Sequence, residues 1–165
     1  MSDTKTSLVY IILGAVNSGK TTKLLSIYDE IHEGDGFVLK KVYREECFIG
    51  QWLERLSTQK GVPFSYKRTF LPANWDEAYR YHDYSFSKRG LEFANKTVQE
   101  IITQKIEPVF IDEIGPLEIM GLGFADLFRQ LLQTEKLIYV TVRDNCFLSV
   151  IDRFKLKDYF LVNIN

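Results

Sequence analysis

The segment that decides the fold covers residues 14–21 and reads Gly14-Ala15-Val16-Asn17-Ser18-Gly19-Lys20-Thr21. It fits the pattern G-x-x-x-x-G-K-[ST] of the phosphate-binding loop, or Walker A motif. The apolar run Leu8–Leu13 before it predicts a buried strand, and Lys20–Ile31 after it carries apolar residues at helical spacing. The motif therefore lies between a strand and a helix, which is the context that this loop requires.

The residue types of this loop suit the binding of a polyphosphate. Consecutive backbone N–H groups and the N-terminus of the following helix attract anions, and glycines let the backbone approach phosphate oxygens closely. We expect Lys20 to reach the β- and γ-phosphates and the Thr21 hydroxyl to bind Mg²⁺. The predicted nucleotide-binding residues are Gly14, Ala15, Val16, Asn17, Ser18, Gly19, Lys20, Thr21 and Thr22.

Residues 109–113 form a second motif, an apolar strand that ends in Asp112 and Glu113. An acidic strand end after a phosphate-binding loop is typical of the Walker B segment, in which the aspartate helps to hold Mg²⁺. We therefore predict Thr21 and Asp112 as metal ligands. Glu113 is then free to orient and deprotonate the water that attacks the γ-phosphate. The alternative is that both acids merely form a solvated strand end. The phosphate-binding loop upstream makes this the weaker interpretation.

Three candidate residues each follow a predicted strand, namely Gly14, Asp112 and Arg143. Right-handed β-α-β crossovers give a parallel sheet with helices on both faces, and ligands bind beyond the carboxyl ends of its strands. The three residues should therefore meet at one edge. Arg143 is a candidate for stabilising charge on the γ-phosphate, and a structural ion pair with Asp144 or Asp152 is an equally good interpretation.

The middle of the chain departs from this alternation of strands and helices. Phe37–Tyr43, Phe48–Leu56 and Phe64–Phe70 are strand-like and follow one another without helices, which predicts an antiparallel insertion over residues 37–70. Residues 71–84 read as an irregular, aromatic-rich loop that either packs on the body, the favoured interpretation, or contacts a nucleobase. The predicted fold is thus a three-layer α-β-α sandwich with a mainly parallel sheet and an antiparallel extension.

The second half returns to alternating helices and strands. Ser87 is a suitable N-cap for a helix over Lys88–Gln104, and Leu137–Val142 is a further buried strand. A short helix over Phe147–Lys155 and a strand over Tyr159–Ile164 complete the chain. A length of 165 residues predicts a single domain covering residues 1–165, and the sequence has no internal repeat.

Composition and charge exclude several classes of protein. The formal net charge of −1 predicts no general attraction to nucleic acid or to anionic membranes. No apolar run approaches the roughly 20 residues that span a bilayer. Residues 1–7 are polar and lack the pattern of a signal peptide, so we expect a cytoplasmic protein.

The cysteines and histidines do not predict a metal site. Cys47 and Cys146 form no C-x-x-C pair and are expected to be small buried apolar side chains. His32 and His82 lack the spacing of metal ligands, so they are expected to be exposed or structural residues. The expected metal is therefore the Mg²⁺ that accompanies a nucleoside triphosphate.

With both motifs placed, the sequence resembles the additional-strand, catalytic-glutamate division of P-loop NTPases, whose mark is the pair Asp112-Glu113. More narrowly, it resembles the small nucleoside-triphosphatase family first described from thermophiles and also found in animals. Pro116 stands where many members carry lysine. The matching segments are the loop 14–22, Phe86-Ser87-Lys88-Arg89-Gly90-Leu91-Glu92-Phe93-Ala94, and Ile111-Asp112-Glu113-Ile114-Gly115-Pro116-Leu117-Glu118.

This resemblance implies Mg²⁺-dependent hydrolysis of nucleoside triphosphates such as ATP or GTP to diphosphates, with broad base tolerance and slow turnover. It implies that the strand Leu137–Val142 lies between the two motif strands, with Thr141 and Arg143 near the γ-phosphate. The catalytic residues would be Lys20, Glu113 and Arg143.

Two other functions share these motifs. The first is a kinase for a nucleoside or small metabolite, for which Lys67-Arg68 and Lys88-Arg89 are weak candidates for an arginine-rich lid. The zinc-bearing thymidine kinases are a poor match, because two scattered cysteines cannot build their zinc module. The second is a nucleotide-dependent binding module in which slow hydrolysis acts as a timer for a protein partner. No guanine-reading N-K-x-D follows the Walker B strand, which disfavours strict GTP specificity.

Overall fold

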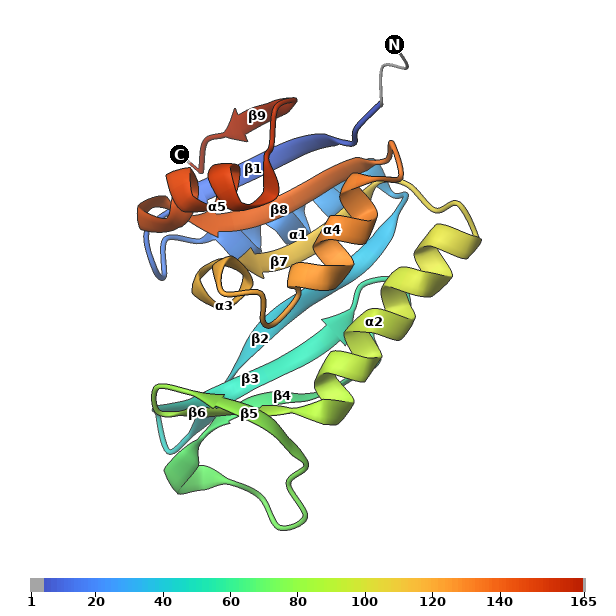
Figure 1. Cartoon of the computed structure of the whole chain (residues 1–165). Coiled ribbons are helices and arrows are strands. Elements are labelled where there is room, and N and C mark those ends of the chain that lie inside the picture. The colour runs from blue at the N-terminus through green and yellow to red at the C-terminus, as the bar shows by residue number, and fades with distance from the viewer. Residues whose placement is uncertain (1–4, 165) are drawn as a thin grey trace.

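The structure is a computed structural model that describes residues 5–164, so residues 1–4 of the polar N-terminal segment lie outside the described residues. Strands and helices alternate at both ends of the chain, and consecutive strands fill its middle (Figure 1). The helices are α1 (Lys20–Ile31), α2 (Lys88–Thr103), α3 (Pro116–Ile119), α4 (Ala125–Leu132) and α5 (Phe147–Phe154). The strands are β1 (Leu8–Gly14), β2 (Asp35–Arg44), β3 (Cys47–Arg55), β4 (Gly61–Lys67), β5 (Glu77–Tyr81), β6 (Tyr84–Ser87), β7 (Val109–Ile114), β8 (Leu137–Arg143) and β9 (Tyr159–Val162). None of the helices within residues 5–164 is long and apolar enough to cross a membrane.

All these strands belong to one nine-stranded sheet with the order β5-β6-β4-β3-β2-β7-β8-β1-β9. The strands from β2 to β9 in this order pair in parallel. From β2 outward through β3, β4, β6 and β5 every pairing is antiparallel. The predicted three-layer α/β fold with an antiparallel extension is therefore confirmed. β8 lies between β1 and β7, as the resemblance implied.

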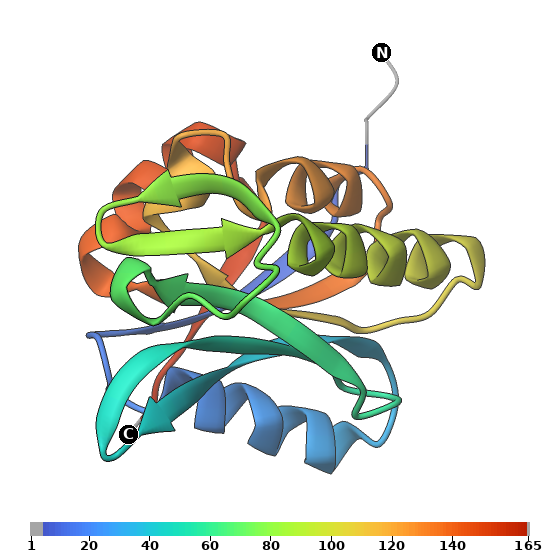
Figure 2. The ribbon, with the colours of Figure 1, turned by 90° about the horizontal axis from the view of Figure 1, so that it is seen from below.

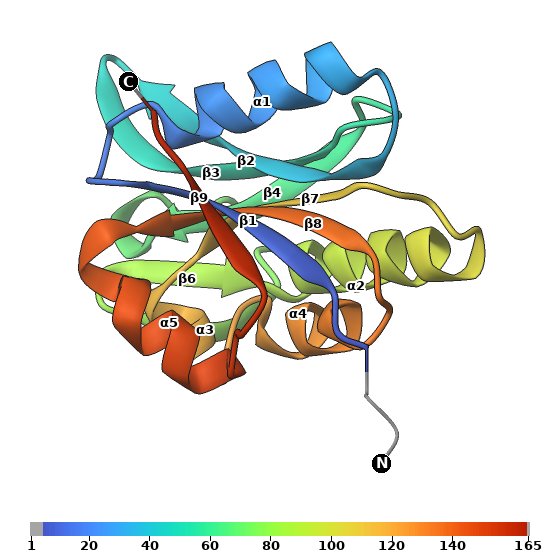
Figure 3. The same cartoon turned by 90° about the horizontal axis from the view of Figure 1, so that it is seen from above.

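Alternation along each central strand sends side chains to two separate cores. On β1, Ile11 belongs to the larger core while Ile12 belongs to the smaller one, and on β7 Ile111 and Phe110 divide in the same way. α1 covers the smaller core by itself, through the fully buried Leu24. Figures 2 and 3 show α1 on one side of the sheet and α2, α4 and α5 on the other. Both faces are thus covered, which is why the parallel strands read as nearly continuous apolar runs.

Two expectations about the middle of the chain were wrong. Residues 71–84 were expected to be an irregular loop, yet Glu77–Tyr81 and Tyr84–Ser87 form a hairpin that adds two strands to the sheet. Its tight turn lies at His82, whose φ of 53° is left-handed, a conformation that sequence patterns do not assign readily to histidine. Cys47 was expected to be buried but is exposed, because it follows the turn at the tip of the β2–β3 hairpin.

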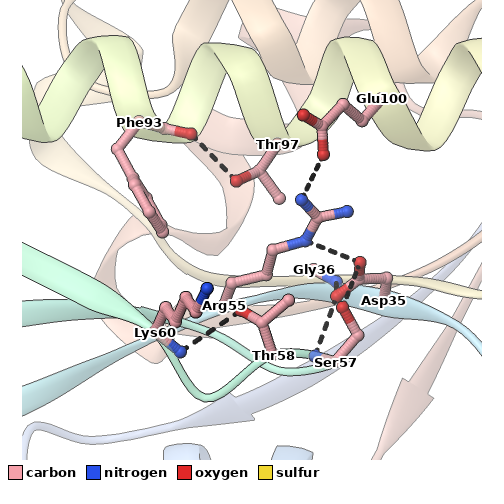
Figure 4. A network of polar contacts seen from close by, with 9 residues as sticks. All are labelled: Asp35, Gly36, Arg55, Ser57, Thr58, Lys60, Phe93, Thr97 and Glu100. Carbon is pink, nitrogen blue, oxygen red and sulfur yellow. Dashed lines mark hydrogen bonds and ion pairs between the residues drawn. The ribbon is translucent and has the colours of Figure 1, made fainter.

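A buried ion-pair network fixes the start of β2 (Figure 4). Asp35 is only 1% exposed, and Arg55 Nε donates to its Oδ2 atom at 2.8 Å. Ser57 donates to Asp35 from its backbone N–H at 3.1 Å and from its hydroxyl at 2.7 Å. The second arm of Arg55 pairs with Glu100 on α2. Because Asp35 is paired with Val109, the first residue of β7, the network lies at the sheet edge opposite to the carboxyl ends of the parallel strands.

Asp35→Ala is expected to lower the free energy of unfolding by about 3–5 kcal/mol, because it leaves the Arg55 guanidinium without its buried partner. Urea denaturation of the purified proteins measures this loss. The control is Asp126→Ala, which removes an exposed partner of Arg129 and should cost less than about 1 kcal/mol. Equal losses in the two variants would contradict a structural role for this network.

Candidate active site

The phosphate-binding loop has the closed shape that its glycines predict. The backbone is left-handed at Asn17 (φ 59°) and at Gly19 (φ 94°), which begins α1. A Cβ atom on Gly14 would crowd the Ser18 side chain, so glycine at this position leaves room for the loop to fold back on the end of β1. Lys20 Nζ donates to the carbonyl oxygen of Ala15 at 2.5 Å, which places the ammonium group inside the loop.

Asp112 joins the two sequence motifs through direct contacts. Its Oδ2 atom accepts a hydrogen bond from the Thr21 hydroxyl at 2.8 Å and from the Leu39 backbone N–H at 3.1 Å. Its Oδ1 atom accepts from the Thr141 hydroxyl on β8 at 2.6 Å. The two predicted metal ligands, Thr21 and Asp112, therefore touch although they lie 91 residues apart.

Burial, followed by the charge of the neighbouring Glu113, raises the pKa of the Asp112 carboxyl from 3.8 to about 6. The hydrogen bonds from Thr141, Leu39 and Thr21 oppose this shift, because they stabilise the charged form. Ionising this carboxyl group costs free energy in the metal-free protein, and a cation beside it would offset that cost.

The raised pKa of Asp112 predicts a pH-dependent stability of the metal-free protein. The folded state binds more protons than the unfolded state between pH 3.8 and about 6, so the free energy of unfolding should fall as the pH rises through this window. A rise in pKa from 3.8 to about 6 corresponds to about 3 kcal/mol. Urea denaturation at a series of pH values with EDTA measures the fall.

The same series on Asp112→Asn provides the control, because this variant cannot ionise at that position. Its unfolding free energy should depend on pH differently from that of the wild-type protein, and the buried Glu118 is one of the groups that contribute to the remaining pH dependence. Burial, followed by the charge of Glu113, raises the pKa of Glu118 well above its ordinary value. An unchanged slope in Asp112→Asn would remove Asp112 as the cause.

Glu113 is turned into the site by an irregularity of β7. The pairing register between β7 and β8 shifts between Ile111 and Ile114, and Glu113 has a left-handed φ of 62°. Its backbone N–H donates to the Thr141 hydroxyl at 2.7 Å instead of joining the regular ladder. Its Oε2 atom accepts a hydrogen bond from Gln51 Nε2 on β3 at 2.8 Å. A non-glycine residue in this conformation costs free energy and is typical of functional sites.

Lys20 lies within the electrostatic reach of the other candidate residues. Burial lowers the pKa of Lys20, the charge of Glu113 opposes this effect, and the charge of Arg143 adds to it. Arg143 ends β8, where it is the register partner of Gly14. Within residues 5–164 it forms no ion pair with Asp144 or Asp152, the structural alternative considered from the sequence. Its charge is therefore available to a ligand.

A pocket of about 910 Å³ joins these groups. Asp112, Glu113, Thr141 and Arg143 line it, which brings every predicted catalytic and metal-binding residue to one space. Gly14, the last residue of β1, and Ala15, which follows it, do not line the pocket. The predicted loop residues that do line it are Val16, Asn17, Ser18, Gly19, Lys20, Thr21 and Thr22.

Sequence reasoning missed three contributors to this site. Gln51 holds the Glu113 carboxylate, the backbone of Leu39 donates to Asp112, and Lys41 donates to Asn17 of the phosphate loop. A glutamine inside an apolar strand was a signal that could have found Gln51. The other two come from β2, which the sequence did not place beside the loop.

The aromatic residues of the 71–84 segment divide between structure and pocket. Trp75 donates to the Ser85 hydroxyl at 2.8 Å, and Tyr79 stacks on Phe86 with ring centroids 5.3 Å apart. These two rings pack the hairpin, as the favoured interpretation predicted. Tyr81 lines the pocket and is therefore accessible to a ligand.

Comparisons with known proteins agree with this geometry. A family model described as NTPase matches residues 9–165. The chain is 25% identical over 133 residues to nucleoside-triphosphatase THEP1 of Thermotoga maritima, an alignment that covers 81% of this chain and 72% of that protein.

Two solved structures are also similar. The crystal structure of THEP1 from Aquifex aeolicus has a TM-score of 0.71 at 22% identity and covers 96% of this chain and 90% of its own. The solution structure of a human cancer-related nucleoside triphosphatase has a TM-score of 0.65 at 22% identity, with 96% and 89% coverage. At this identity they show the shared fold. Together with the family model and the placed motifs, they identify the chain as an enzyme of the small P-loop nucleoside-triphosphatase family.

Proposed function

We propose that this enzyme hydrolyses nucleoside 5′-triphosphates to the diphosphate and phosphate in a Mg²⁺-dependent reaction with broad base tolerance. The observation that carries the proposal is the contact between Thr21 and Asp112, with Glu113 beside it in the same pocket. Two oxygen ligands that can bind a cation, and a carboxylate that can orient a water, thus lie next to the phosphate-binding loop. We also propose that residues 1–165 form one domain, since all described strands belong to one sheet.

The oxygen donors at the junction of the two motifs fit Mg²⁺. A hydroxyl and a single carboxylate suit this ion, because it keeps several waters and takes few protein ligands. Thr21 and Asp112 would hold it, and when bound it neutralises charge on the phosphate oxygens. Thr141 and the Leu39 backbone fix the orientation of the Asp112 carboxylate.

The residues of the chain then have separate roles in the reaction. The loop amides and Lys20 bind the phosphate oxygens and stabilise the charge that develops on them. Glu113, held by Gln51, orients the attacking water and accepts its proton. Arg143 is in place to stabilise charge on the γ-phosphate. All these groups recognise phosphate or water, which supports tolerance of different bases.

A phosphate-release assay across ATP, GTP, CTP and UTP tests this proposal. We expect release from each nucleotide with Mg²⁺ and loss of release when EDTA replaces it. Similar rates across the four bases would support the broad tolerance. Phosphate release from only one of the four nucleotides would contradict the broad base tolerance. Phosphate release that is unaffected by EDTA would contradict the metal dependence.

A further inference from the structure

The pocket extends well beyond the phosphate-binding loop, and it does so in one direction. From the loop at the end of β1 it passes Asp112 and Glu113 on β7 and continues to residues of β3, β4, β5 and β6. No residue of β9, on the other side of β1, lines it. Part of the pocket therefore lies past Glu113, beside the antiparallel extension.

The chemistry of hydrolysis shows which part of the nucleotide faces this space. The attacking water and the leaving β-phosphate lie roughly in line on opposite sides of the γ-phosphorus. If Glu113 holds the water, the β-phosphate and the nucleoside lie on the side of the γ-phosphate away from Glu113. The space past Glu113 thus adjoins the face of the γ-phosphate that a nucleophile approaches, and the nucleoside of the bound triphosphate does not fill it.

Aromatic side chains form a wall in this part of the pocket. Phe48 on β3 and Tyr84 on β6 have ring centroids 6.1 Å apart, and the ring centroid of Tyr43 on β2 lies 6.0 Å from that of Phe48. All three line the pocket, and Tyr43 is 57% exposed. Aromatic side chains that line a concave pocket favour a ligand with a planar ring, because stacking on them depends little on which base the ligand carries.

The charges around this space favour an uncharged ligand. Lys40 and Lys41 line the pocket, but Lys40 is paired with Glu54 at 2.8 Å, and Lys41 keeps its charge and is directed to Asn17 of the phosphate-binding loop. Glu113 and Glu118 present carboxyl groups to the same pocket. Repulsion from the Glu113 carboxylate would disfavour a second nucleotide.

Glu118 also offers this ligand a polar contact. It is only 4% exposed, and within residues 5–164 its Oε2 atom has no hydrogen-bond partner. Buried polar atoms usually have partners, so an orphaned one in a pocket wall is typical of a ligand site. A ring with polar edges meets this requirement better than a plain hydrocarbon.

We propose that the space past Glu113 binds an uncharged nucleoside, whose hydroxyl group replaces water as the acceptor of the γ-phosphoryl group. This inference rests on the proposed triphosphate site. A bond forms between the hydroxyl oxygen and the γ-phosphorus, and the bond from that phosphorus to the β–γ bridging oxygen breaks. The hydroxyl proton passes to Glu113, and the products are a nucleoside monophosphate and a nucleoside diphosphate.

The test follows the label from γ-labelled ATP with Mg²⁺ in the presence of adenosine, guanosine, cytidine or uridine. We expect label in the monophosphate of at least one nucleoside, at the expense of free phosphate. Phe48→Ala should lower the ratio of nucleoside monophosphate to free phosphate by about tenfold, because it removes a stacking surface. Phe48→Leu, which keeps the apolar volume and should preserve the fold, should lower the ratio in the same direction.

Phe160→Ala is the matched control, because Phe160 is an exposed ring on β9 outside the pocket and should leave the ratio unchanged. Label that appears only in free phosphate with all four nucleosides would overturn this inference and leave the proposed hydrolysis intact. A ratio that Phe48→Ala and Phe48→Leu do not change would also overturn it. Label in neither product would contradict the proposed hydrolysis itself, and with it this inference.

Discussion

Replacing Glu113 with glutamine is expected to lower kcat for triphosphate hydrolysis by about 10²–10⁴-fold, the usual contribution of a positioned general base. Glutamine keeps the size of the side chain and can still meet Gln51, but it cannot accept the proton of the attacking water. Binding of Mg²⁺ and nucleotide should persist, because the loop, Thr21 and Asp112 are intact. Single-turnover phosphate release, with nucleotide affinity measured separately, distinguishes the two effects.

Asp144→Asn is the matched control for Glu113→Gln. It removes the same charge from an exposed acid that lies near Lys20 at the end of β8 and does not line the pocket. It should leave kcat nearly unchanged. If Glu113→Gln turned over at the wild-type rate, Glu113 would not be the base.

Lys20→Met is expected to weaken triphosphate binding and to lower kcat/KM by about 10²–10³-fold or more, the range found when one charge-stabilising donor is removed from an active site. Methionine keeps the length and apolar stem of lysine, so the loop should retain its shape while the charge is lost. Calorimetric titration with a non-hydrolysable triphosphate and the phosphate-release assay measure the two losses.

The control for Lys20→Met is Lys23→Met on the same helix. Lys23 carries the same charge but does not line the pocket. A loss of similar size in both variants would indicate a general effect of charge on anion binding, and it would contradict a specific role for Lys20.

The parallel half of the fold could be predicted because its signals are local. The apolar runs of β1, β7 and β8 are long enough to read as buried strands, and the loop at 14–21 fixes which strand precedes a helix. Once strands and helices alternate, the handedness of crossovers brings Gly14, Asp112 and Arg143 to one edge. The contact between Thr21 and Asp112 follows from topology in this way, although no pattern joins the two residues in sequence.

The parts that the sequence did not predict depend on non-local pairing. The β5–β6 hairpin is held by its register with β4 and by the packing of Tyr79 on Phe86, neither of which a local pattern contains. The left-handed backbone of Glu113 arises from the shift between β7 and β8, and its partner Gln51 comes from a strand 62 residues earlier. Such contacts decide in which direction the side chain of a predicted site residue points, and they form only when the sheet is assembled.

The most direct test of the central claim is a crystal structure with Mg²⁺ and a non-hydrolysable triphosphate. We predict that the ion coordinates the Thr21 hydroxyl with Asp112 bound directly or through water, that Lys20 contacts the β- and γ-phosphates, and that a water beside Glu113 faces the γ-phosphate. A triphosphate bound elsewhere on the molecule, or an ion held without Thr21 and Asp112, would contradict the account.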